Sequence, residues 1–208
     1  MVEQWRPIKQ KFDEMYERFI EHIEQRGVEI PDSGILAGPV CPVRPMIEAG
    51  QVRKRDMGWD NAHFPLDYRL LMQEGIPGII QRASVPRSDL PLSQQMYRAL
   101  IADCWIRIRE YVRQHGEAAL ARAETMPEDT VRLKRMAFNC LELTCHAPET
   151  FEQGLQLFWF IWRLRSNFTS CIGRMDVHLQ SLYARDVPQR ISREEALALL
   201  CELWEKLN

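Results

Sequence analysis

The sequence predicts a mainly α-helical protein with little or no β-sheet, and three observations support this class. Apolar residues recur three and four positions apart through most of the chain. Few segments show the alternation of apolar and polar residues that is typical of a strand. Prolines and glycines gather between residues 27 and 63 and separate one helical pattern from the others. The 208 residues, 46% of them apolar, suffice for one sizeable core or for part of a larger one.

The first predicted helix covers residues 4–26, where apolar side chains from Trp5 to Ile23 share one face. Gly27 follows as a plausible C-terminal stop. Residues 27–63 are predicted to be loop, with at most short extended pieces. A loop of this length inside a compact domain is usually functional or disordered, so the segment is a candidate for carrying binding groups.

Helical patterns return at Pro65, a residue suited to a first turn, and predict a short helix over 65–74 that Gly75 ends. One or two further turns are expected after Gly75. A long helix is predicted over 92–123, with Gly116 as a weak point inside it. Two more helices are expected to start at prolines, over 127–145 and 148–165.

The helix predicted over 148–165 is apolar on nearly all sides between Leu155 and Trp162, which predicts burial on most of its surface. A short helix over 175–183 and a final one from Ser192 follow, the latter opened by a Ser192–Glu195 capping box. The final helix is predicted to leave an apolar face that no later residue can cover, formed by Leu199, Leu203, Trp204 and Leu207.

Composition excludes several classes of function. The net charge of -2 gives no electrostatic reason to expect nucleic acid as a partner. No apolar stretch reaches the length of a membrane span, and residues 1–6 do not resemble a secretory signal. The six cysteines are scattered and form no Cys-x-x-Cys pair, which predicts reduced thiols in a cytoplasmic protein, with no disulfide framework and no zinc site.

Four stretches of the chain resemble, in order, stretches of the glycyl radical enzymes, the pyruvate formate-lyase-like family that includes glycerol dehydratase-like members. They are His63–Ile79, Pro148–Gln156, Gly173–Asp186 and Ile191–Leu207. Each stretch alone is a weak signal, but four in order over 59–208 predict membership. The first 58 residues match poorly. We therefore expect two parts: residues 1–63, a helix plus a Pro/Gly-rich loop region, and residues 64–208, the helical part of the family's domain, incomplete at the C-terminus.

The resemblance implies a fold and a chemistry. The family's fold is a large α/β barrel wrapped in helices, whose N-terminal region supplies outer helices and part of the active-site wall. In complete members a glycyl radical, installed by a separate radical-SAM activating enzyme under anaerobic conditions, takes hydrogen from a mid-chain cysteine. The resulting thiyl radical acts on a small polar substrate, in lyase, dehydratase or transferase reactions that break a C–C, C–O or C–N bond.

Neither radical-bearing motif occurs in these 208 residues, which contain no Gly-Tyr or Gly-Phe pair. The resemblance therefore implies no catalytic residue and no bound cofactor in this chain, and inactivity on its own. Its expected partners are a missing C-terminal portion or a complementing chain, the activating enzyme for the intact protein, and a second copy in a homodimer. The alternative is a stand-alone helical protein derived from the family that binds a partner chain. A stand-alone protein should bury Leu199, Leu203 and Leu207, whereas a fragment should expose them.

His63 is the strongest candidate for substrate binding. The resemblance places a polar or cationic side chain of the substrate pocket here, and a histidine can hydrogen-bond a hydroxyl or a carboxylate. Trp59 and Asp60 are expected to line the same wall. The competing interpretation is a histidine that satisfies local backbone at a helix start. At this position pyruvate formate-lyase itself carries an arginine. The histidine found here, His63, favours the dehydratase-like branches of the family.

Other reactive-looking residues are interpreted as structural. Cys140 and Glu142 match the family's Cys-x-Glu pattern, but they lie in a helical run far upstream of the expected position of the thiyl cysteine. Arg174 and Asp176 stand where a loop becomes a helix, where a carboxylate favours the N-terminal end and an arginine can pair with a carboxylate of a packed neighbour. His146 beside Cys145 supplies two ligands, too few for a metal site.

Overall fold

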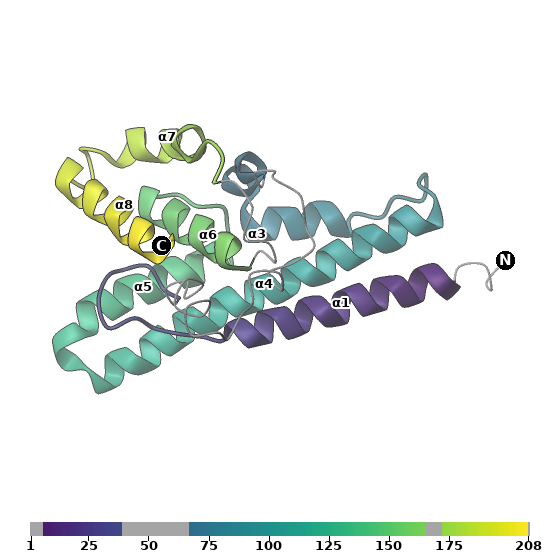
Figure 1. The fold of residues 1–208 in the computed structure, drawn as a ribbon. Coiled ribbons are helices and arrows are strands. Elements are labelled where there is room, and N and C mark those ends of the chain that lie inside the picture. Colours follow the sequence, from purple (N-terminus) through teal and green to yellow (C-terminus); the bar gives the residue numbers. More distant parts are fainter. Residues whose placement is uncertain (1–5, 39–66, 165–171, 208) are drawn as a thin grey trace, which may run out of the picture.

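The computed structural model of the chain describes residues 6–38, 67–164 and 172–207. These residues form helices and connecting loops, with no strand among them (Figure 1). The elements are α1 (Arg6–Arg26), α3 (Tyr68–Ser84), α4 (Leu92–Thr125), the 3-10 turn η3 (Pro127–Asp129), α5 (Thr130–Leu143), α6 (Phe151–Leu164), α7 (Met175–Asp186) and α8 (Arg193–Leu207). The predicted mainly α class is confirmed. No helix of this described part is long and apolar enough to cross a membrane.

The long helix α4 is the spine of the fold, and α1, α3 and α5 pack along it (Figure 1). On the other side α6 lies between α5, α7 and α8, so it is the central element. Every residue of α6 except Ile161 is buried, which confirms the burial predicted from its apolar sequence. Tyr68 of α3 stacks on Phe158 of α6 with ring centroids 4.4 Å apart and joins the two sides in one core.

The first helix ends as predicted. Gly27 adopts a left-handed φ of 62° and closes α1 by donating its N–H to the carbonyl oxygen of Glu24. Residues 27–38 contain no helix and agree with the predicted loop, while the rest of the predicted loop, residues 39–63, lies outside the described part.

The helix predicted to start at Pro65 begins instead at Tyr68 within the described residues. Asp67 is its N-cap, because its side chain accepts the N–H of Leu70 at 3.2 Å. Gly75 interrupts α3, as expected, with a φ of 62°. A Cβ at Gly75 would lie 2.6 Å from the Cα of Ala147, so only glycine lets the kink approach the α5–α6 connection. The second half continues to Ser84, further than the expected one or two turns.

Gly116 does not weaken α4, which is continuous through it. A Cβ at Gly116 would lie 2.8 Å from the Cγ of Leu141, so the glycine allows α5 to pack closely on α4. Neither following proline starts an α-helix directly. Pro127 opens η3 before α5, and Pro148 precedes the N-cap Thr150, whose hydroxyl accepts the N–H of Gln153 before α6 begins at Phe151.

The capping box of α8 is confirmed, since Ser192 N–H donates to Glu195 at 2.7 Å and Glu195 N–H donates to the Ser192 hydroxyl at 3.1 Å. The predicted uncovered face of α8 is wrong. Leu199 and Leu203 are only 3% and 1% exposed, because they face the shared core, and Leu207 is half-buried. Of the predicted face only Trp204 stays 60% exposed.

Candidate functional site: a polar cradle around residues 29–38

The predicted substrate contacts Trp59, Asp60 and His63 lie outside the described residues. The described residues instead show how the chain is held just before that segment. Residues 29–38 rest on polar side chains from α4, α5, α6 and α8, which we call the cradle: His115, Arg122, Arg132, Gln156, Glu202 and Lys206.

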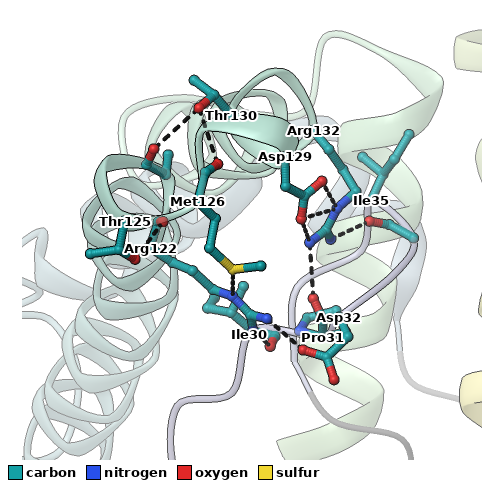
Figure 2. A network of polar contacts seen from close by, with 12 residues as sticks. Ile30, Pro31, Asp32, Ile35, Arg122, Thr125, Met126, Asp129, Thr130 and Arg132 are labelled. Carbon is teal, nitrogen blue, oxygen red and sulfur yellow. Dashed lines mark hydrogen bonds and ion pairs between the residues drawn. The ribbon is translucent and has the colours of Figure 1, made fainter.

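Two arginines hold the first half of the loop (Figure 2). Arg122, near the end of α4, donates to the carbonyl oxygen of Ile30 at 2.7 Å and pairs with Asp32. Arg132, in the first turn of α5, donates to the carbonyl oxygens of Gly34 at 2.7 Å and Pro31 at 3.2 Å. Asp129 pairs with Arg132 and orients it. The planar fork of each guanidinium allows these simultaneous bonds.

Glu202 of α8 holds the middle of the loop through its carboxylate. It accepts the N–H of Ile35 at 2.9 Å and the N–H of Leu36 at 2.7 Å. The preceding residue, Gly34, has a φ of 79°, and a Cβ there would lie 2.3 Å from Glu202 Oε1. Only glycine therefore permits this approach, and charge-assisted bonds to consecutive amides make it a strong anchor.

Gln156 and Lys206 fix the end of the loop in the core. The amide of Gln156 makes paired bonds with Ala37, accepting its N–H at 2.6 Å and donating to its carbonyl oxygen at 3.2 Å. Lys206 Nζ donates to the carbonyl oxygen of Gly38 at 2.6 Å. Both side chains are buried, and burial lowers the pKa of Lys206. The backbone is thus fixed at the last described residue before position 39.

His115 of α4 completes the cradle as a neutral imidazole. Its Nδ1 lies 2.8 Å from the carbonyl oxygen of Tyr111, so Nδ1 carries the proton and Nε2 accepts the N–H of Glu29 at 3.5 Å. Burial lowers the pKa of His115 to about 4, and the charges of Lys206 and Arg163 act in the same direction.

The stretches that carry the family resemblance meet where α6 packs on α7. Asp186, the last residue of the Gly173–Asp186 stretch, accepts the N–H of Phe151 at 2.7 Å and so caps α6 from another helix. A Cβ at Gly154 would lie 2.6 Å from Leu182 and 2.8 Å from Leu179, so glycine lets α7 lie close. These residues serve packing and capping.

Arg174 and Asp176 bond to each other and link no two elements of the described fold. Asp176 lies in the first turn of α7, as expected, and Arg174 holds the pKa of its carboxyl down to about 2. Both side chains are exposed and pair with each other at 2.7 Å. The expected bond from Arg174 to a packed neighbour is wrong, because the nearest carboxylate is two residues along the same turn.

Cys140 is fully buried in α5, where burial raises the pKa of its thiol, as suits a packing residue. His146 bonds to Glu142 at 2.7 Å instead of turning toward Cys145 as a second ligand. Among the described residues, no group of three or more His, Cys, Asp or Glu side chains is arranged to hold a metal ion.

Sequence reasoning missed the cradle, although two signals were present. Gln156 interrupts the most apolar helix, and Lys206 lies on the apolar face of α8, three residues after Leu203. A polar residue on such a face needs a partner. Here the partners lie 119 and 168 positions away along the chain, in a loop without periodic pattern.

The described part of the chain is a helical scaffold that anchors one loop. Comparison with known proteins gives the family. The family model described as pyruvate formate lyase-like matches residues 43–208. The chain belongs to the pyruvate formate lyase-like family.

Its relatives are dehydratases. The chain is 32% identical over 162 residues to the probable dehydratase YbiW of Escherichia coli K12, covering 71% of this chain and 20% of that protein. It is 31% identical over 160 residues to the (2S)-3-sulfopropanediol dehydratase of Klebsiella oxytoca, covering 70% and 19%. The chain thus spans about a fifth of the length of these relatives.

Solved structures show the same fold. The B12-independent glycerol dehydratase of Clostridium butyricum superposes with a TM-score of 0.59. A protein of Roseburia inulinivorans, solved in a study of 1,2-propanediol dehydration, superposes with a TM-score of 0.62. Each is 21% identical, with 70% of this chain and 20% of the other covered. The described helices therefore correspond to a helical part of that larger fold.

Proposed function

We propose that this chain is the N-terminal part of a glycyl radical dehydratase that acts on a small polar substrate. The observation that carries the proposal is the family match over residues 43–208. The similar curated proteins are dehydratases, and this chain spans only about a fifth of their length. The proposed contribution of this part is to hold one wall of the substrate pocket and to leave the radical chemistry to residues elsewhere in the intact enzyme.

The cradle supports this role by its position in the chain. It fixes the backbone up to Gly38, and the segment that follows in sequence carries Trp59, Asp60 and His63. We assign substrate binding to these three residues, with His63 bonding a hydroxyl or an acidic group of the substrate. A precisely held anchor matters because small displacements of binding groups reduce rates strongly.

The radical-bearing residues have no counterpart in the 208 residues. In the proposed scheme a radical-SAM activating enzyme installs the radical in the intact protein, in an anaerobic cytoplasm. The chain by itself then binds no cofactor and turns over no substrate. Residues 1–63 and 64–208 would act as two parts, the first carrying the loop and the pocket side chains and the second the supporting helices.

The test compares residues 1–208 with the product of the complete reading frame, each incubated anaerobically with the activating enzyme. Substrates are glycerol, propane-1,2-diol and (2S)-3-sulfopropanediol. We expect dehydration and a glycyl radical signal in electron paramagnetic resonance only from the complete product. Turnover by residues 1–208 alone would disprove the assigned division of labour.

A second candidate is a stand-alone helical protein that binds a partner chain, and one observation favours it: α8 buries Leu199 and Leu203 within the chain. This candidate predicts that residues 1–208 elute as one species in size-exclusion chromatography and do not enhance the fluorescence of a hydrophobic dye. A reading frame that continues past Asn208 into a radical-glycine motif would exclude it.

A further inference from the structure

Three buried hydrogen-bond donors near the cradle lack a partner in the described part of the chain. They are Nε of Arg163, Nε1 of Trp159 and the hydroxyl of Tyr111. Arg163 is only 9% exposed, and the other two residues are buried more completely. Buried polar groups are nearly always paired in folded proteins, so three unpaired donors in one region need an explanation.

The three donors belong to one neighbourhood between α4 and α6. Trp159 and Arg163 are four residues apart on α6, so their side chains are neighbours on the helix surface. Tyr111 of α4 packs edge-on against Phe160, with ring centroids 5.8 Å apart. The charge of Arg163 acts on Tyr111, where it opposes the rise in pKa that burial causes. The same charge reaches His115 and Lys206.

A guanidinium stays charged at physiological pH, and Nε of Arg163 has no partner among the described residues. The charge of Glu29 acts on Tyr111 and Lys206, and that of Glu202 acts on Lys206, but no ion pair joins either carboxylate to Arg163 in the described part. A second buried cation, Lys206, lies 5.8 Å from the centre of the Trp159 ring. A buried charge is costly unless it is paired. Guanidinium and indole nitrogens only donate, so the missing partner is an acceptor, and a negatively charged acceptor matches the guanidinium best.

We propose that Arg163, together with Trp159 and Tyr111, forms a binding site for an oxyanion, with a carboxylate as the best match to the guanidinium. The carboxylate belongs either to a small molecule or to an acidic side chain of the same protein. The proposed site uses none of the residues assigned to substrate contact, Trp59, Asp60 and His63. It does not depend on radical chemistry, so it can be tested whether or not the proposed function holds.

Thermal unfolding of residues 1–208 tests the proposal, with sodium acetate titrated against sodium chloride at equal ionic strength. Three variants are compared with wild type: Arg163→Met, Trp159→Phe and the matched control Arg109→Met, which removes an exposed arginine of α4. If a free carboxylate binds, acetate raises the wild-type midpoint saturably, by roughly 5 °C at large excess. Arg163→Met abolishes the rise, Trp159→Phe weakens acetate binding several-fold, and Arg109→Met behaves like wild type.

If the protein supplies the carboxylate itself, acetate has no effect and Arg163→Met lowers the midpoint by more than Arg109→Met does, because an acidic side chain then loses its partner. Either result supports an oxyanion at Arg163. The proposal is overturned if acetate has no effect and Arg163→Met leaves the midpoint unchanged or raises it, which is the result expected when only water occupies the site. If Arg163→Met does not fold, the weaker acetate binding expected of Trp159→Phe still tests the site.

Discussion

Lys206 of α8 donates a hydrogen bond of 2.6 Å to the carbonyl oxygen of Gly38, across 168 positions of sequence. The bond links the last described helix to the first loop, and Glu202, one turn earlier on α8, holds the same loop at Ile35 and Leu36. The loop and α8 therefore stabilise each other. Because residue 39 follows directly, this link also sets where the next segment of the chain begins.

Glu202→Ala should release the loop. Two backbone amides lose a charged acceptor, which should cost about 2–3 kcal/mol in the free energy of unfolding. Hydrogen exchange at the amides of Ile35 and Leu36 should accelerate in the variant. Glu205→Ala, which removes an exposed carboxylate from the same helix, is the control and should leave exchange unchanged. Equal exchange rates in wild type and Glu202→Ala would contradict the anchoring role.

Gly75→Ala and Gly78→Ala should differ sharply, although the two residues share α3. Gly75 has a left-handed φ, and a Cβ there meets the backbone of Ala147 at 2.6 Å, so the substitution should cost about 3 kcal/mol or more. At Gly78 an added Cβ would lie 2.8 Å from the Cβ of Glu74, so the helix must shift locally, but φ is not left-handed and alanine favours the helix. We expect Gly78→Ala to cost about 1 kcal/mol in urea unfolding, clearly less than Gly75→Ala. Similar losses in both would contradict the close packing at Gly75.

Stability should fall as pH drops because of His115. Burial holds its pKa at about 4, whereas an unfolded histidine titrates near 6.5, so the unfolded chain takes up a proton first. The contribution is fully present above about pH 6.5 and is lost progressively toward pH 4, with a span of roughly 3 kcal/mol. Urea unfolding between pH 4 and 7.5 measures it. His115→Asn should flatten the dependence in this window, and an unchanged slope in that variant would assign the effect to other groups.

Asp186→Ala should destabilise the α6–α7 junction by about 1–2 kcal/mol, because Phe151 loses the carboxylate that caps the start of α6. Asp176→Ala on the same helix is the matched control. Its carboxylate is exposed and forms an ion pair only with its neighbour Arg174 among the described residues, so the unfolding midpoint should hardly move. Equal midpoints for the two variants would show that the cap contributes little.

Helices, the buried character of α6 and the capping box were predictable because each depends on local sequence pattern. Helix starts were predicted less well. Pro65 and Pro148 suggested first turns, but Asp67 and Thr150 offer side-chain oxygens to free N–H groups and set the described starts. The burial of Leu199 and Leu203 could not be predicted, because their cover comes from elements distant in sequence.

The cradle was unpredictable for a related reason. Its bonds join helices to a loop whose sequence has no periodicity, and most of them end on backbone atoms, which no side-chain pattern reveals. Two of the stretches that carry the family resemblance contain close contacts between helices, at Asp186 and at Gly154.

The most direct measurement is kcat/KM of the intact, anaerobically activated enzyme carrying His63→Ala, with the glycyl radical signal recorded in the same samples. If His63 contacts the substrate, kcat/KM falls by about 100-fold or more while the radical signal stays at the wild-type level. His178→Ala, which alters a half-buried histidine of α7, should remain close to wild type. An unchanged kcat/KM in His63→Ala would contradict the assignment of this part of the chain to the substrate wall.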